Sequence, residues 1–331
     1  MPRSDFVALL QAISSKHNFT CTSLSHDWII QITDPLSGRV CNIFGYTFDV
    51  NGAGAHEVCK EKAATAQVLE ARGVPCIPHH VFLSPSNPFT AEYLPRKGNS
   101  ERLRQLVETV GWPVVVKPLK GTGGAGVVKA TCWKELEAAV QVTFGIEYGL
   151  AVSPYKKIVD EYRCVCLDGK VELVYRKVRK HVIGDGLSTL AELITKAMAA
   201  VNSIEAAALA SAAVENSVEA WSRVPQSGEE VPLQWKHNLG QGASVDLQVP
   251  QEKQAQVEVV AVAAAKAIGV RFCSADVVEV DGEGMIIMEV NGGVMMDSLL
   301  GQLGDQGQDL ATRIYETAVL SALAAQAVPP I

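Results

Sequence analysis

The stretch that decides the fold is Trp112-Pro-Val-Val-Val-Lys-Pro-Leu-Lys-Gly-Thr-Gly-Gly-Ala-Gly-Val-Val-Lys129. Its β-branched residues predict a strand that ends at Lys117, followed by a glycine-dense loop and a second strand that begins near Val127. Glycines let backbone N–H groups approach phosphate oxygens without an intervening side chain, and a lysine on the adjoining strand adds a full positive charge. The pattern is typical of a flexible flap over a polyphosphate.

Other phosphate-binding patterns compete for the same glycines. Gly121, Gly123 and Gly126 satisfy the G-x-G-x-x-G dinucleotide fingerprint. That fingerprint requires a helix directly after the glycines, whereas β-branched Val127 and Val128 favour a strand. A Walker A loop also fails, because no Lys-Ser or Lys-Thr pair follows the last glycine. A glycine-rich hairpin that binds no ligand remains an alternative.

A second informative segment, Met288-Glu-Val-Asn291, lies far downstream. It reads as a strand, so Glu289 and Asn291, two residues apart, lie on one face. Their carboxylate and amide oxygens are hard ligands of the kind that Mg²⁺ prefers. The chain therefore carries candidate groups for a polyphosphate and for its metal.

Four segments in family order resemble the ATP-grasp superfamily in its carboxylate–amine ligase branch. The first is the strand that ends in Lys117-Pro118, together with its glycine loop. The last is the set of candidate metal ligands Asp276, Glu289 and Asn291. The run Lys177-Val-Arg-Lys-His-Val-Ile-Gly-Asp-Gly-Leu-Ser-Thr-Leu-Ala-Glu-Leu-Ile194 resembles the ATP-grasp module of cyanophycin synthetases. Trp235-Lys-His-Asn-Leu-Gly-Gln-Gly-Ala243 resembles a segment of ribosomal-protein-modifying glutamate ligases, which are similar to glutathione synthetase-type enzymes. The resemblance covers about residues 57 to 305.

The resemblance implies an α+β ATP-grasp fold, in which two α+β subdomains clasp ATP behind a short N-terminal α/β domain. The implied boundaries are 1–56 for the N-terminal domain, 57–155 for the ATP-grasp N-subdomain with its glycine-rich lid, and 156–331 for the C-subdomain with the metal site. Helical periodicity predicts a helix over 57–72, which the Gly-Val-Pro turn ends. The alanine-rich stretch 190–220 predicts one or two further helices.

The resemblance also assigns residues to ATP, to metal and to catalysis. Those assigned to ATP are Lys117, Gly121, Gly123 and Gly124 at the phosphates, Ser153, Pro154 and Tyr155 at the adenine hinge, and Glu161, Lys236 and Asn238 around the nucleotide or substrate. Those assigned to Mg²⁺, with Mn²⁺ as an alternative metal, are Asp276, Glu289 and Asn291. Those assigned to catalysis are Arg163, Lys177 and Arg179.

Some of these assignments leave alternatives open. Lys177 falls where relatives have an arginine next to an acyl phosphate, and Arg179 occupies a position that is usually proline. Which of the two stabilises the acyl phosphate therefore stays open. Asp276 could simply cap a strand while Glu289 pairs with a cation. Lys62, on the polar face of its helix, reads as a solvated residue.

The implied function is that of an ADP-forming carbon–nitrogen ligase. Such an enzyme uses ATP to convert a carboxylate into an acyl phosphate, which an amine attacks to form an amide or peptide bond with release of ADP and phosphate. The expected substrate is an amino acid or a small peptide. An ATP-grasp phosphotransferase and a catalytically silent nucleotide-binding regulator are the alternative functions.

Composition narrows the class of partner. The 331 residues carry a formal net charge of −7, which gives no broad basic surface for nucleic acid. No apolar run approaches the ~20 residues of a membrane span, and the N-terminus lacks the apolar core of a signal peptide. The eight cysteines include no Cys-x-x-Cys, so we expect free thiols. We expect a cytoplasmic protein that binds small-molecule acids and amines, neither nucleic acid nor membrane, with a homodimer left open.

Overall fold

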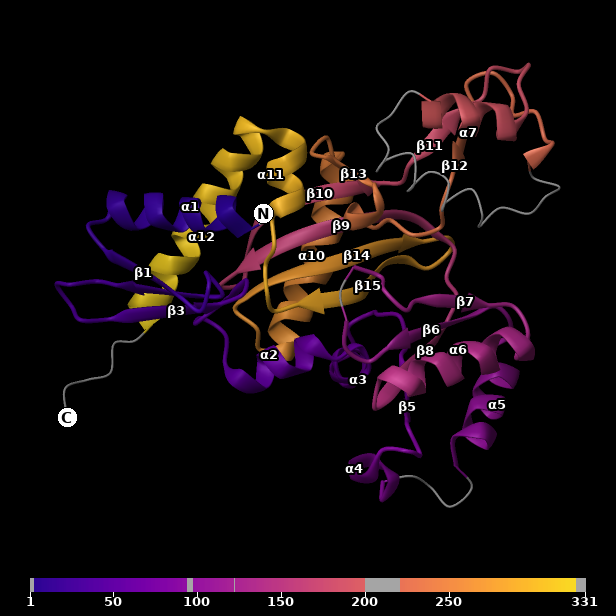
Figure 1. The fold of residues 1–331 in the computed structure, drawn as a ribbon, viewed down its shortest axis with the longest axis horizontal. Helices are drawn as coiled ribbons and strands as arrows, with labels where there is room; N and C mark the ends of the chain where they lie inside the picture. Colours follow the sequence, from indigo (N-terminus) through magenta and orange to yellow (C-terminus); the bar gives the residue numbers. More distant parts are fainter. Residues whose placement is uncertain (1–2, 94–97, 122, 200–220, 326–331) are drawn as a thin grey trace. The chain divides into compact units, whose positions relative to one another are not determined.

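The computed structural model describes residues 3–93, 98–121, 123–199 and 221–325 of the chain (Figure 1). The chain forms two compact units. The first comprises Met1–Tyr175 and Val249–Ile331, and the second is Arg176–Gln248. None of the described helices is both long enough and apolar enough to cross a bilayer.

An antiparallel sheet opens the first unit. Its strands are neighbours in sequence order, namely β1 (Thr20–Leu24), β2 (Ile29–Thr33), β3 (Val40–Phe44) and β4 (Thr47–Phe48). Helix α1 (Arg3–Lys16) contacts this sheet at β1. All pairings are antiparallel, so the segment is built as α+β and not as alternating βα units.

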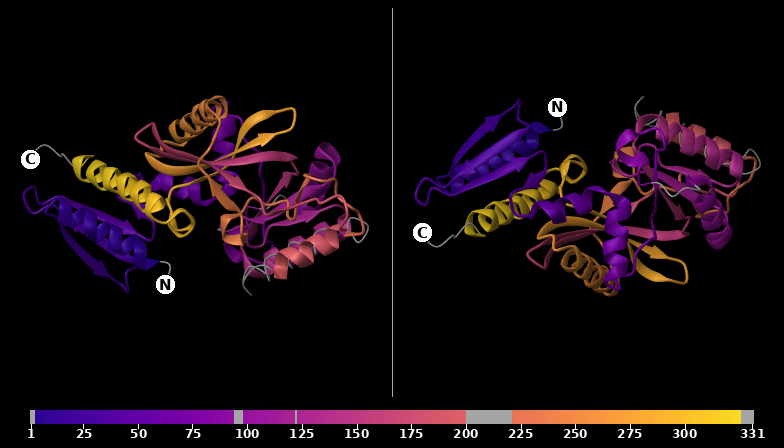
Figure 2. Two further views of the ribbon diagram at one scale, coloured as in Figure 1. Left: turned by 90° about the horizontal axis from the view of Figure 1, so that it is seen from above. Right: turned by 90° about the horizontal axis from the view of Figure 1, so that it is seen from below.

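The C-terminal end of the chain completes this N-terminal layer. Helices α11 (Asp297–Leu303) and α12 (Asp305–Ala325) follow the last strand, and α12 contacts α1, β3 and β4 (Figure 2). The Tyr315 ring of α12 lies 5.0 Å from Phe6 and 5.5 Å from Phe48, centroid to centroid. These two helices were not expected from the sequence. The predicted domain boundaries after residues 56 and 155 stay predictions.

The helix predicted over residues 57–72 is two helices in the structure. Helix α2 (Ala53–Lys60) and helix α3 (Lys62–Ala71) are separated by Glu61, whose φ of −120° and ψ of 117° are extended. The Glu61 carboxylate accepts a hydrogen bond of 3.0 Å from the backbone N–H of Ala64, which caps α3. The prediction of a single helix was wrong because no glycine or proline marks this break.

A second antiparallel sheet contains the glycine-rich segment. Its strand order is β5 (His80–Leu83), β8 (Gly149–Pro154), β6 (Val114–Pro118) and β7 (Val128–Ala130). Helices α5 (Gly98–Val110) and α6 (Trp133–Ile146) bury one face of this sheet, and the short α4 (Pro88–Ala91) precedes α5. Val114 and Val116 point into that core, so Lys117 belongs to the opposite face.

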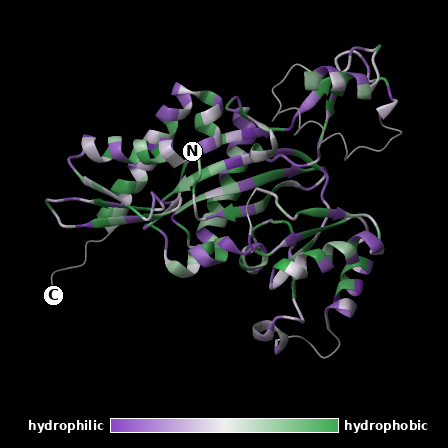
Figure 3. Cartoon of the chain, viewed as in Figure 1, coloured by the Kyte–Doolittle hydropathy of each residue, from purple (hydrophilic) through white to green (hydrophobic). Residues whose placement is uncertain are grey.

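A third sheet carries the predicted metal ligands. In the first unit its strand order is β10 (Lys170–Val178), β9 (Ile158–Leu167), β14 (Phe272–Val280) and β15 (Gly284–Asn291). Helix α10 (Gln251–Ile268) packs on it through Val257, Ala261 and Ala264, and Figure 3 shows the apolar character of the central strands. All eight cysteines are free thiols, as predicted.

The second unit has its own small core. The end of β10 pairs with β13 (Ser244–Asp246), and β11 (His181–Ile183) pairs with β12 (Glu230–Pro232). Helix α7 (Leu190–Ala199) packs Leu193 against Val182 and Leu233. A 3₁₀ turn, η1 (Leu239–Gln241), follows. The helices predicted over 190–220 are described as far as Ala199, and residues 200–220 lie outside the described part.

Candidate active site

Lys117 lies near the end of β6, on the sheet face opposite the α5/α6 core. Ala151 of β8 is its register partner, and Ala151 packs with Ala63 of α3 and with Leu119, which follows β6. Burial lowers the pKa of the Lys117 ammonium to about 8, against the raising effect of the Glu289 carboxylate. The lysine predicted from the strand pattern therefore lies on a covered face, close to a predicted metal ligand.

His79 contacts Lys117 directly. Its Nε2 lies 2.9 Å from Lys117 Nζ, and its Nδ1 lies 2.7 Å from the carbonyl oxygen of Ile77. The side chain is buried. Burial, followed by the charge of Lys117, lowers the pKa of His79 well below its usual value, so the imidazole is neutral. Sequence reasoning missed His79, since no motif spacing links it to Lys117.

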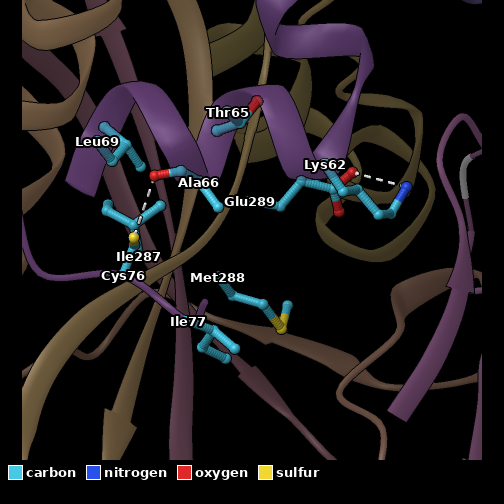
Figure 4. A pocket seen from close by; sticks show the side chains of 9 residues that line it. All are labelled: Lys62, Thr65, Ala66, Leu69, Cys76, Ile77, Ile287, Met288 and Glu289. Carbon is cyan, nitrogen blue, oxygen red and sulfur yellow. Dashed lines mark hydrogen bonds and ion pairs between the residues drawn. The ribbon is translucent and has the colours of Figure 1, made fainter. Parts of the chain in front are cut away.

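Lys62 and Glu289 point toward each other across the start of α3 and the strand β15 (Figure 4). Lys62 Nζ is 3.4 Å from Glu289 Oε1 and donates a 2.9 Å hydrogen bond to the carbonyl oxygen of Gly121. The Lys62 side chain is only 12% exposed, so it is not the solvated helix residue that the sequence suggested. It joins the glycine loop to the predicted metal face.

Asp276 and Glu289 are direct neighbours across the β14–β15 ladder. Asn291 pairs with Ser274 on the same face, two residues along each strand. This face offers two carboxylates and an amide, the oxygen ligands suited to Mg²⁺. Within the described ranges, no group of three or more His, Cys, Asp or Glu side chains is gathered as a metal cluster. Any metal set here therefore depends on the Asn291 amide as well as the carboxylates.

Arg163, predicted as catalytic, forms a two-point ion pair with Asp276. Its Nε and Nη2 donate to the two carboxylate oxygens at 2.8 and 2.9 Å, and the two residues are register partners on β9 and β14. The side chains are 19% and 4% exposed. Such a pair fixes the direction of the Asp276 carboxylate.

The glycine loop between β6 and β7 has the backbone conformation of a ligand cradle. Gly123, Gly124 and Gly126 have φ of 68°, 69° and 68°, a region that side chains disfavour. Around Gly121 and Gly123 an added Cβ would meet nothing within 4 Å, so the space beside them is open. The glycines therefore place no side chain in the space beside Gly121 and Gly123.

The predicted adenine hinge lies at the end of β8. Ser153 pairs with Val115, so it shares the Lys117 face, and its buried Oγ has no hydrogen-bond partner among the described residues. The Tyr155 N–H donates to the Pro113 carbonyl at 3.1 Å, with Pro154 between the two hinge residues. Glu161, at the start of β9, is buried. An orphaned buried hydroxyl is costly unless a ligand or water completes it.

The remaining predicted residues lie in the second unit. Lys177 and His237 are both buried, and burial, with the charges of Arg179 and Lys177, lowers the pKa of His237 to about 3. The Asn238 side chain accepts a 2.9 Å bond from the Gly240 N–H and caps η1. Lys236 Nζ lies 5.4 Å from the centre of the Trp235 ring. The charges of Lys177 and Arg179 therefore both act on a histidine that is neutral at pH 7.

Known proteins similar to this chain are ligases and synthetases. No protein-family model matches it. A cyanophycin synthetase of Trichormus variabilis is 34% identical over 148 residues, which are 44% of this chain and 15% of that protein. A probable alpha-L-glutamate ligase of Pseudoalteromonas atlantica is 25% identical over 284 residues, or 83% of this chain and 68% of that protein. The chain thus spans about 15% of the length of the cyanophycin synthetases that it matches.

Solved structures show the same fold. The D-alanine–D-alanine ligase of Bacillus anthracis aligns with a TM-score of 0.54 and 16% identity, over 83% of this chain and 71% of that one. A bifunctional glutathione synthetase of Pasteurella multocida aligns with a TM-score of 0.54 and 17% identity, over 94% of this chain and 43% of that one. The predicted fold and the predicted resemblance are confirmed. The chain has the ATP-grasp fold and is similar in sequence to cyanophycin synthetases and alpha-L-glutamate ligases.

Proposed function

We propose that the protein is an ATP-dependent carboxylate–amine ligase that forms an amide or peptide bond through an acyl phosphate and releases ADP and phosphate. The acid is an amino acid or a small peptide, and the second substrate is an amine. Relatives named as synthetases and ligases support the reaction class. The cytoplasmic location, the homodimer and the exclusion of nucleic acid remain predictions.

The observation that carries the proposal is the meeting of two lysines with a metal-type face. Lys117 and Lys62 flank Glu289, and Glu289 neighbours Asp276 across the ladder. Cations attract phosphate oxygens, while carboxylates hold the metal that neutralises them, and phosphoryl transfer depends chiefly on such positioning and neutralisation. An ion pair that only stabilised the fold would need one lysine beside Glu289, whereas both Lys62 and Lys117 act on this carboxylate.

The residues present fit ATP and its metal. The open glycine backbone suits phosphates, and the orphaned Ser153 hydroxyl gives the hinge an unused hydrogen-bonding group. Asp276, Glu289 and Asn291 would hold Mg²⁺, or Mn²⁺ in its place. Bound ATP supplies the phosphoryl group that makes the acid oxygen a leaving group.

The protein side chains have separate roles in this proposal. Lys117 attracts the phosphates, and Arg163 fixes the direction of the Asp276 carboxylate. Lys177 and Arg179 are the proposed catalytic cations of the second unit, which stabilise the acyl phosphate and the anion formed when the amine attacks. His237, whose pKa burial and these two charges lower to about 3, adds no competing charge at neutral pH.

The test is hydroxylamine trapping across a panel of amino acids and short peptides. Hydroxylamine intercepts an acyl phosphate as a hydroxamate, whereas a phosphate monoester survives it. We expect one acid to give hydroxamate with MgATP, amine-dependent ADP release with the same acid, and a large loss in the Lys177→Ala/Arg179→Ala double variant. A stable phosphorylated product without amine would establish the phosphotransferase instead. Tight MgATP binding with no turnover on any acid would favour the silent regulator.

A further inference from the structure

Lys117 needs support, because a flexible lysine on a covered face can point its ammonium in several directions. Both Lys117 and Lys62 lie close to Glu289, and two cations beside one carboxylate repel each other. A neighbouring group that accepts a hydrogen bond from the Lys117 ammonium would therefore determine the direction in which this charge points toward a phosphate. His79 is such a group, because its Nε2 lies 2.9 Å from the Lys117 ammonium.

The hydrogen-bond pattern fixes the proton on the His79 ring. The Ile77 carbonyl oxygen can only accept, so Nδ1, 2.7 Å away, must carry the hydrogen. In the neutral ring this leaves a lone pair on Nε2, which accepts from Lys117 Nζ at 2.9 Å. The reverse arrangement would place an Nδ1 lone pair against the carbonyl oxygen and is excluded.

Ile77, whose carbonyl oxygen accepts the hydrogen bond from His79, is itself hydrogen-bonded to the strand that carries Glu289. The Ile77 N–H donates to the Ile287 carbonyl, and the Ile287 N–H donates to the Pro75 carbonyl, both at 2.9 Å. Glu289 follows Ile287 by two residues on β15. The backbone of β15 thus positions His79 on one side and Glu289 on the other.

We infer that His79 is a positioning residue of the nucleotide site, whose Nε2 lone pair aims the Lys117 ammonium at the phosphates. This inference deepens the proposed function and rests on it for the identity of the ligand. His79 itself touches no substrate atom in this scheme. Its neutral state, set by burial and by the neighbouring Lys117 charge, which both lower its pKa, matches the acceptor role.

Two substitutions separate this role from a purely structural one. Counting bonds from Cβ, the side-chain amide nitrogen of asparagine takes the place of Nδ1, and the amide oxygen of glutamine takes the place of Nε2. His79→Asn therefore keeps the donor to Ile77 and loses the acceptor for Lys117. His79→Gln keeps the acceptor for Lys117 and loses the donor to Ile77. His80→Asn, at the exposed neighbouring position, is the matched control.

We expect the two variants to rank in opposite orders in two measurements. By calorimetry, the Kd for MgATP should rise about tenfold in His79→Asn, as for loss of a hydrogen bond to a charged group, and stay near the wild-type value in His79→Gln. By thermal unfolding, His79→Gln should be the less stable of the two, because it loses the buried bond to Ile77. In a Lys117→Met background, His79→Asn should have no further effect on Kd. His80→Asn should change neither measurement.

A wild-type Kd in His79→Asn, or losses of affinity that follow the losses of stability, would overturn the positioning role. A wild-type protein that does not bind MgATP would instead refute the proposed function. In that case the hydrogen bond is tested without nucleotide by ¹⁵N NMR of the histidine rings, with His79 assigned from His79→Asn. We expect an Nδ1–H tautomer whose Nε2 signal shifts in Lys117→Met. An Nε2–H tautomer, or no shift, would overturn the inference.

Discussion

The charge of Lys117 should control nucleotide affinity within an accessible range of pH. Burial lowers the pKa of its ammonium to about 8 against the raising effect of Glu289, with Lys62 lowering it further. Below this pH the side chain is a cation that attracts phosphate oxygens, and above it the side chain is a neutral amine. The affinity for MgATP should therefore fall as the pH rises through about 8.

The size of the effect follows from the charged fraction. A group with a pKa of about 8 is charged in about nine-tenths of the molecules at pH 7 and in about one-tenth at pH 9. When only the charged form binds tightly, the apparent Kd is the intrinsic Kd divided by that fraction. The Kd should therefore rise about tenfold between these two conditions, or about 1.4 kcal/mol. ATP contributes little to the change, because the last phosphate proton, with a pKa of about 6, is already lost.

The assay is calorimetric titration of MgATP at fixed ionic strength and saturating Mg²⁺, in pH steps across this range. Lys117→Met keeps an apolar stem and is the control, with a flat profile and an affinity lower by about 1.5–3 kcal/mol at neutral pH. Thermal unfolding at each pH confirms that both proteins stay folded. A flat wild-type profile, or the same slope in Lys117→Met, would refute the assignment of Lys117 to the phosphates.

Three further substitutions probe other parts of the site. Glu289→Gln should lower Mg²⁺-dependent ADP release with little loss of stability, which a Mg²⁺ titration and a thermal melt would check, and undiminished turnover would contradict a metal role. Arg163→Met should cost about 3–5 kcal/mol in urea unfolding because Asp276 is left buried without its partner, and Asp276→Leu in the same chain should recover part of the loss. Gly126→Ala should destabilise by about 1–3 kcal/mol, because its φ of 68° is strained for alanine and the new Cβ would lie 2.9 Å from a proline ring. Gly123→Ala, strained but open, should cost less in the same assay, and equal losses would argue against the close contact.

The parts of the fold that local patterns define could be predicted. The strand before the glycine loop appears as β6 and ends at Pro118, one residue after the expected end at Lys117, because β-branched residues and glycines act over a few positions. The break at Glu61 was missed, because the sequence Lys60-Glu61-Lys62 suits a helix as well as a cap.

The contacts between residues of the site could not be predicted from local sequence patterns. Strand alternation placed Glu289 and Asn291 on one face, yet it could not reveal that Lys62, 227 positions earlier in the chain, lies beside Glu289. Likewise the pairing of Arg163 with Asp276 depends on the register of β9 against β14, which neither strand encodes alone. The chemical role of these residue types could be interpreted from the sequence, whereas tertiary packing determines which residues they contact.

His79 shows why one part of the site escaped sequence reasoning. Backbone hydrogen bonds join Ile77 and Pro75 to Ile287, on the strand that carries Glu289, and most side chains at those positions would keep them. The direction of the Lys117 ammonium depends instead on a side chain 38 positions away. A lone buried histidine is usually a satisfied core residue, and only the pair of distances to Ile77 and Lys117 gives its ring a defined donor and acceptor. Backbone geometry therefore brings the segment before His79 to the strand that carries Glu289, and in our inference the His79 lone pair gives the Lys117 ammonium its direction.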